Sequence, residues 1–182
     1  MQISSSLPRP VPANLAENSV AIRRAAARLC GQLGWVVLHE VPLPNGRRAD
    51  ILALLPDGSF ACIEVKSGPR DFLADSKWPD YRDFCDALYF AVDEDFPREL
   101  LPGDTGVMVA CVGASGCGGG YGGAGALFVH EAELLCEAPV HALKAARRRA
   151  LTHRFASIAA GRLALLEDPA ITASLRAALR VE

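Results

Sequence analysis

The chain has 182 residues, of which 51% are hydrophobic and 22% charged, and its formal net charge is −2. This length suits one domain with a sizeable core, and the composition excludes a disordered chain. No apolar run approaches the ~18 residues of a membrane span, and residues 1–18 lack the basic start and apolar block of a secretion signal. We therefore expect a cytoplasmic protein with reduced thiols and no membrane partner.

In chain order, the sequence predicts a helix over 18–33, with Asn18 as its N-cap and Gly34 as its stop. A strand over 35–41 and a turn at 44–46 precede two strands, 47–55 and 59–66, which are joined by the turn 56–58. A helix that Pro79 breaks or kinks is expected over 68–86, followed by strands at 87–92 and 106–113. A strand within 126–135 and a helix from 139 onward complete an α/β fold, a central mixed sheet flanked by helices on both faces.

These elements predict one domain over 18–166, with a loose Ser/Pro-rich arm at 1–17 and a helical tail at 167–182. Residues 113–125 hold eight glycines in thirteen positions, and "GGGYGG" fits the pattern G-x-G-x-x-G. No Gly-Lys-Ser/Thr follows, and the next segment has the character of a strand rather than a helix. We interpret this Gly-rich loop as a flexible connection and expect no nucleotide cofactor.

The charges are unevenly distributed along the chain. Residues 70–104 hold ten acids against four bases, whereas residues 141–166 hold six Lys or Arg and no acid. The basic helix predicted at 139–160 is therefore either a solvated face or a surface that binds DNA phosphates through Arg147, Arg148 and Arg149.

Charged residues interrupt the central hairpin. If Pro56-Asp57-Gly58 forms a three-residue loop, Leu55 lies opposite Ser59 and Asp50 lies opposite Glu64, with Cβ atoms ~5 Å apart, where like charges repel. Lys66 shares a face with Glu64, and both faces are otherwise largely apolar. We therefore expect a central pair of strands whose charges gather at one end of one face.

Two arrangements would offset this repulsion. One is a buried Asp–Lys–Glu ion cluster, which needs good geometry because burial of charge is costly. The other is an oxygen-ligand site for Mg²⁺, or Mn²⁺, with Asp50, Glu64 and the Val65 backbone carbonyl as ligands. That site would suit phosphodiester cleavage, since the metal lowers the pKa of a bound water, and Lys66 could orient this water or neutralise transition-state charge.

Asp50, followed after thirteen residues by Glu64-Val65-Lys66, resembles the motif of the PD-(D/E)xK nuclease superfamily, although Ala49 stands where the superfamily name has Pro. More closely, residues 40–102, including "DSKWPDYRDFCD", are similar to the MmcB family of bacterial DNA-repair endonucleases. The resemblance covers residues 20–165, and the Gly-rich loop looks like an insertion. It implies a restriction-endonuclease-like core, action on DNA in repair alongside repair-complex proteins, metal ligands at Asp50 and Glu64, and a catalytic Lys66.

The superfamily often has a further glutamate on the first helix, for which Glu17 is the candidate here. Glu40 competes with it as a third acidic ligand. A three-residue loop over 44–46 places Glu40 opposite Asp50, whereas a two-residue Asn-Gly turn places it on the other face.

Further DNA-binding candidates surround the site. Arg47 and Arg48 either hold phosphates or are solvated, and Lys77 could contact the DNA backbone. Trp78 and Tyr81 either stack on bases or pack against the sheet. Our hypothesis is a Mg²⁺-dependent endonuclease of DNA repair; the alternative is a DNA-binding or scaffold module of a repair complex with weak or no catalysis.

Overall fold

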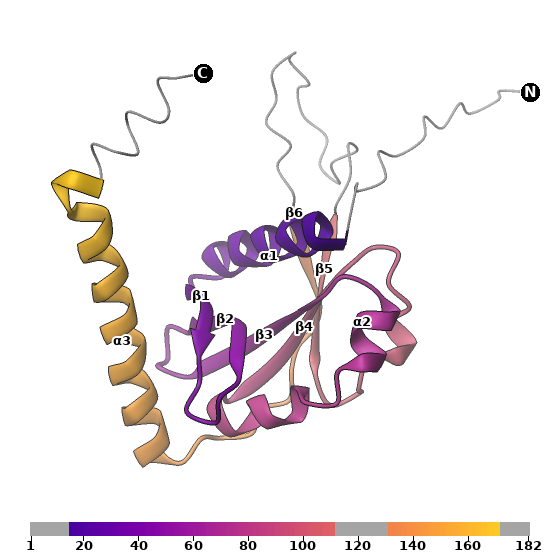
Figure 1. Cartoon of the computed structure of the whole chain (residues 1–182). Helices are drawn as coiled ribbons and strands as arrows, with labels where there is room; N and C mark the ends of the chain where they lie inside the picture. The colour runs from indigo at the N-terminus through magenta and orange to yellow at the C-terminus, as the bar shows by residue number, and fades with distance from the viewer. Residues whose placement is uncertain (1–14, 112–130, 172–182) are drawn as a thin grey trace, which may run out of the picture. The chain divides into compact units, whose positions relative to one another are not determined.

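A six-stranded mixed sheet forms the framework of the protein, and helices lie on both of its faces (Figure 1). The computed structural model describes residues 15–111 and 131–171. The described residues up to Ala142 form one compact unit, and those from Leu143 to residue 171 form a second. The elements are α1 (Leu15–Gln32), β1 (Val36–Pro42), β2 (Arg48–Leu54), β3 (Phe60–Lys66), α2 (Pro69–Ala74), η1 (Trp78–Phe84), β4 (Ala87–Asp93), η2 (Arg98–Leu100), β5 (Gly106–Cys111), β6 (Glu131–Cys136) and α3 (Ala145–Glu167).

The strands are arranged in chain order, β1-β2-β3-β4-β5-β6. The first three are antiparallel, β3, β4 and β5 are parallel, and β6 returns antiparallel to β5. The parallel step from β3 to β4 requires a crossover, which α2 and η1 provide. The predicted α/β architecture with a mixed sheet is therefore confirmed. No helix within the described ranges is long and apolar enough to cross a membrane.

Two three-residue loops set the register of the first three strands. In the second loop Leu55 donates to the Ser59 carbonyl at 2.9 Å, and Ile51 pairs with Ile63, which confirms the predicted register. In the first loop the Leu43 amide donates to the Arg47 carbonyl at 2.7 Å. This loop therefore has three residues, 44–46, and is not the two-residue Asn-Gly turn. Glu40 consequently lies on β1 between the pairs formed by its two neighbours, across from Asp50.

The α1 helix covers one face of the sheet. Its apolar side, which includes Ile22, Ala26 and Leu29, packs against inward-facing residues of the strands such as Ile63 and Met108. The opposite face is covered by α2 and η1, where the rings of Phe72 and Trp78 meet that of Phe90 at centroid distances of 5.4 and 5.6 Å. Every residue of β3 is buried, because both faces of this strand are covered.

Side chains alternate between the two faces of a strand. Ile51, Ile63 and Val65 belong to the cluster under α1. Asp50, Glu64 and Lys66 therefore belong to the other face, beneath α2 and η1. This is the end of the hairpin at which the sequence places its charges.

Three element boundaries differ from the prediction. The first helix begins at Leu15, so Asn18 is not its N-cap; the Asn18 amide instead donates to the Asp93 carboxylate and the Ser67 carbonyl. The helix expected over 68–86 is two short helices, because the chain is extended at Asp75. The basic helix begins at Ala145 rather than 139, since the His141 amide donates to the Asp86 carbonyl and holds that segment against the sheet unit.

The N-terminal arm up to residue 14, the Gly-rich loop 113–125 and the tail beyond residue 171 lie outside the described residues.

Candidate active site

Asp50, Glu64 and Lys66 come together where the β2–β3 ladder ends. The last regular pair is Ile51 with Ile63, and beyond it Asp50 Oδ2 accepts a 2.9 Å hydrogen bond from the Val65 amide. Lys66 Nζ lies 3.2 Å from Glu64 Oε1. Glu64 is only 8% exposed and Lys66 only 3%, whereas Asp50 is half-buried. The structure thus brings the three residues of the predicted motif into one cluster.

Asp75 is a member of this cluster that the sequence did not single out. It follows α2, and its Oδ2 lies 2.6 Å from Lys66 Nζ while its Oδ1 accepts a 2.8 Å hydrogen bond from the Lys77 amide. Lys66 is therefore held between two carboxylates, one from its own strand and one from the crossover. The available signal was its position as the first residue of "DSKWPDYRDFCD".

The cluster holds more negative than positive charge. Burial, and then the charge of Asp50, raise the pKa of Glu64 to about 8. Burial also raises the pKa of Asp50, against the hydrogen bond from Val65. Burial alone would lower the pKa of Lys66, but its bonds to Asp75 and Glu64 outweigh that effect and raise it. These surroundings thus favour the charged form of Lys66, and they favour the protonated form of Glu64 when no further cation is near.

The donor set suits a hard divalent cation. Mg²⁺ binds oxygen, retains several waters and commonly uses only one or two protein carboxylates. Asp50 and Glu64 supply two carboxylates, and the Val65 carbonyl is an oxygen donor between Glu64 and Lys66. In residues 15–111 and 131–171, no group of three or more His, Cys, Asp or Glu side chains is arranged to hold a metal. The residues therefore fit Mg²⁺ as a two-carboxylate site and not as a larger acidic cage.

Glu40, the tentative third ligand, is engaged elsewhere. Its Oε1 bonds to Arg23 Nη1 of α1, and its Oε2 lies 2.6 Å from Arg48 Nε of β2. Its charge still acts on Asp50, whose pKa it raises while Arg23 lowers it. Glu17, the weaker candidate, lies exposed in the first turn of α1. Arg23 is a second residue at the site that the sequence did not single out.

The remaining candidates lie around the cluster. Arg47 forms an ion pair with Asp80 at 2.8 Å, and Lys77 is exposed directly after Asp75 and Ser76. Trp78 packs edge-on against Phe90, and the Arg82 guanidinium lies 5.6 Å from the centre of its ring. Tyr81 is buried and donates a 3.1 Å hydrogen bond to the Arg48 carbonyl. The two aromatic side chains thus pack against the sheet unit in this structure.

The candidate arginines of the basic helix belong to the second unit. Arg147 and Arg149 are exposed on α3, and Arg148 is half-buried there.

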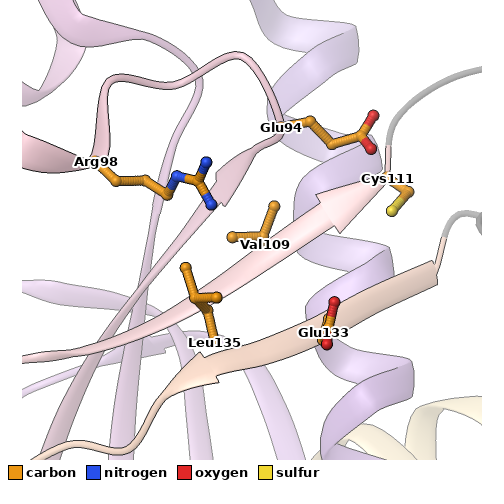
Figure 2. Close-up of a pocket in the computed structure, with 6 residues that line it drawn as sticks. All are labelled: Glu94, Arg98, Val109, Cys111, Glu133 and Leu135. Carbon is orange, nitrogen blue, oxygen red and sulfur yellow. The ribbon is translucent and has the colours of Figure 1, made fainter.

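A pocket of about 240 Å³ lies on β5 and β6 (Figure 2). Val109 and Cys111 of β5 and Leu135 of β6 form its apolar floor, and Glu94 and Arg98 reach over it from the connection after β4. Glu133 completes the lining. None of these residues belongs to the Asp50–Glu64–Lys66 cluster, so the pocket and the cluster are separate features of the sheet.

Comparison with known proteins places these observations in a family. Residues 8–170 match the family described as MmcB-like DNA repair proteins. A solved structure of a protein of unknown function from Silicibacter pomeroyi is 36% identical, with a TM-score of 0.69, and the match covers 84% of this chain and 92% of that one. No curated protein matches the sequence.

Proposed function

The chain belongs to the MmcB-like family of DNA repair proteins, and on this premise we propose that it is a metal-dependent DNA endonuclease. The observation that carries the proposal is the clustering of a half-buried carboxylate, Asp50, with a buried carboxylate, Glu64, and a buried lysine, Lys66, at the end of the β2–β3 hairpin. A pure DNA-binding surface has no use for buried acids, because they repel the phosphate backbone. A metal-dependent hydrolytic site for phosphodiesters uses acids to hold the ion and can use a lysine to stabilise charge in the transition state.

In this proposal, Asp50, Glu64 and the Val65 carbonyl hold Mg²⁺, for which Mn²⁺ can substitute. The ion, when bound, lowers the pKa of a water and offsets negative charge on the scissile phosphate. The hydrogen bond from Val65 orients Asp50, so the carboxylate is positioned before any ligand arrives. Lys66 stays protonated between Glu64 and Asp75, and its ammonium orients the attacking water or stabilises charge on the phosphate in the transition state.

The DNA backbone would contact basic side chains around this site. Lys77 and Arg47 lie on segments next to it. The arginines of α3 belong to the second unit and form the densest group of basic residues along the chain. In this proposal Trp78 and Tyr81 do not stack on bases, because both pack against the sheet unit.

Calorimetric titration of Mn²⁺ into the purified protein tests the metal site. We expect Asp50→Asn and Glu64→Gln each to abolish binding while the variants remain folded, because each removes one of two carboxylate ligands. The matched control is Asp104→Asn, which neutralises an exposed carboxylate paired with Arg82 and should bind Mn²⁺ as the wild type does. Unchanged binding in both site variants would refute the metal site.

Cleavage of duplex, flapped and branched DNA tests the activity. Lys66→Ala should keep its DNA affinity and lose Mg²⁺-dependent nicking, because the proposed work of Lys66 lies in the transition state. A wild type that binds Mn²⁺ and DNA but nicks none of these substrates would favour the alternative, a DNA-binding or scaffold module of a repair complex.

A further inference from the structure

Glu40 has an unusual backbone conformation for its position in a strand. Its φ is 51°, and among the described residues it is the one non-glycine with a positive φ. This left-handed conformation is sterically unfavourable for a residue with a Cβ atom, and it persists only where surrounding contacts impose it. The regular pairs on either side, His39 with Ile51 and Val41 with Ala49, show that the distortion is confined to Glu40.

Two arginines from different elements bind the Glu40 carboxylate. Arg23 of α1 bonds to one carboxylate oxygen, and Arg48 of β2 bonds to the other at 2.6 Å. The side chains remain accessible, at 27% exposed for Arg23, 34% for Glu40 and 66% for Arg48. Two guanidinium groups therefore converge on a single oxyanion at the surface.

That geometry is also the geometry of phosphate recognition. Guanidinium groups bind carboxylate and phosphate oxygens through the same charge-assisted hydrogen bonds. The position is also suitable, because Glu40 lies across from Asp50, a proposed metal ligand. Two guanidinium groups face the one Glu40 carboxylate, and a phosphodiester, which also carries one negative charge on two terminal oxygens, could accept hydrogen bonds from both arginines in its place.

We propose that Arg23 and Arg48 form a binding site for a DNA backbone phosphate beside the cleavage site, and that the Glu40 carboxylate occupies this site until DNA displaces it. The inference rests on the proposed function and adds to it a phosphate subsite and an internal competitor. The exchange keeps both arginines paired, moves Glu40 into solvent and removes the reason for its left-handed backbone. Glu40 thus weakens binding to any DNA that does not place a phosphate between the two arginines.

The alternative is that the three residues only fasten α1 to the sheet. Fluorescence anisotropy with a short DNA duplex in EDTA distinguishes the two, because neither metal binding nor cleavage contributes to it. If Glu40 competes with phosphate, Glu40→Gln should tighten binding by about tenfold, the equivalent of one hydrogen bond to a charged group. Arg23→Gln should weaken binding and flatten the slope of log K against log salt by about 0.9. The double variant should bind no more tightly than Arg23→Gln alone.

Two further variants make the result specific. Asp104→Asn also removes one exposed carboxylate from an arginine, Arg82, and should leave affinity nearly unchanged. Glu40→Gly removes the carboxylate and tolerates the positive φ, so it stays folded even if the backbone of Glu40→Gln does not. A Glu40 variant that is folded but binds DNA no more tightly than the wild type would overturn the inference, as would an equal gain in Asp104→Asn.

A second readout separates this inference from the proposed function. Inorganic phosphate should raise the melting temperature of Glu40→Gly more than that of the wild type, and Arg23→Gln should abolish that gain. Phosphate stabilisation through Arg23 in a protein that binds no DNA would show an anion site at Arg23 but would refute both its role in binding DNA and the endonuclease. If the wild type binds DNA normally, but the Glu40 variants neither bind DNA more tightly nor gain more stability from phosphate, the anion site is refuted and the endonuclease proposal still stands.

Discussion

The Val65 amide donates a 2.9 Å hydrogen bond to Asp50 Oδ2, and this bond links the two strands just beyond their last regular pair. It places the β2 carboxylate beside the segment of β3 that carries Glu64 and Lys66. Since both strands pair with a neighbour on each side in the sheet, the site is built on rigid elements rather than on loops. Such a framework holds charged groups close together, which lowers the free energy of unfolding, and this loss can be measured.

The metal-free protein should become less stable as the pH rises through the ionisation of Glu64. The pKa of this carboxyl is about 8 in the folded protein against 4.5 as the ordinary value, so the unfolded chain ionises first. The stabilisation from burying the protonated form is complete below about pH 4.5 and is lost by about pH 8.

The measurement is urea unfolding in EDTA over this pH range. Glu64→Gln has no ionisable group at position 64. At about pH 8 its free energy of unfolding should therefore exceed that of the wild type by an amount on the order of 2–4 kcal/mol. This difference in the free energy of unfolding should shrink as the pH falls toward about 4.5. If both proteins show the same pH dependence, burial of Glu64 is not the cause.

Asp75→Asn should impair catalysis through Lys66. The substitution replaces a charged partner of the ammonium, 2.6 Å away, with a neutral amide. We expect kcat for DNA cleavage to fall roughly tenfold or more, with little change in KM, and the pH–rate limb that depends on Lys66 to move to lower pH.

Asp71→Asn is the matched control, because it also removes one carboxylate charge, and Asp71 lies in α2, where it accepts hydrogen bonds from Ser67 rather than from Lys66. If Asp75 has only a structural role, Asp75→Asn should change the melting temperature without shifting the pH dependence of kcat. An equal loss of kcat in Asp71→Asn would point to the charge of the helix rather than to the position of Lys66.

The sheet and the central hairpin could be predicted because their signals are local. Alternating apolar residues around a three-residue Pro-Asp-Gly loop determine which positions face one another, and that register is the one observed. The parts that could not be predicted depend on distant partners. Asn18 is committed to Asp93 and Ser67, and Asp75 meets Lys66 only because the chain breaks after α2. No periodicity in the sequence records such contacts.

Gly106→Ala should destabilise the sheet unit. A Cβ atom at Gly106 would lie 2.2 Å from Cδ1 of Tyr89 and 2.8 Å from the backbone nitrogen of Ala138, so both a packed ring and the backbone would have to move. We expect a loss of about 1–3 kcal/mol in the free energy of unfolding. Gly103→Ala, whose Cβ would meet nothing within 4 Å, should change it by about 0.5 kcal/mol or less. Equal denaturant midpoints for the two variants would contradict the close packing at Gly106.

The α3 helix should contribute to DNA affinity and not to the chemistry. Between residues 141 and 166 the chain carries six basic residues and no acid, although its net charge is −2, so α3 is its largest basic concentration. If α3 holds the DNA backbone, replacing Arg147, Arg148 and Arg149 with Gln should weaken binding to all sequences alike. It should also flatten the slope of log K against log salt by about 0.9 for each phosphate that an arginine no longer neutralises.

Mn²⁺ binding should be unchanged in this triple variant, because no proposed metal ligand lies on α3. Arg98→Gln is the control, since it removes an exposed arginine outside the helix and should leave the salt slope as it was. Only contacts between individual arginines and phosphates release counterions, so the slope distinguishes them from a general change in net charge. A triple variant with the affinity and salt slope of the wild type would mean that these arginines form a solvated face, and the DNA would then have to be held by the basic residues of the sheet unit.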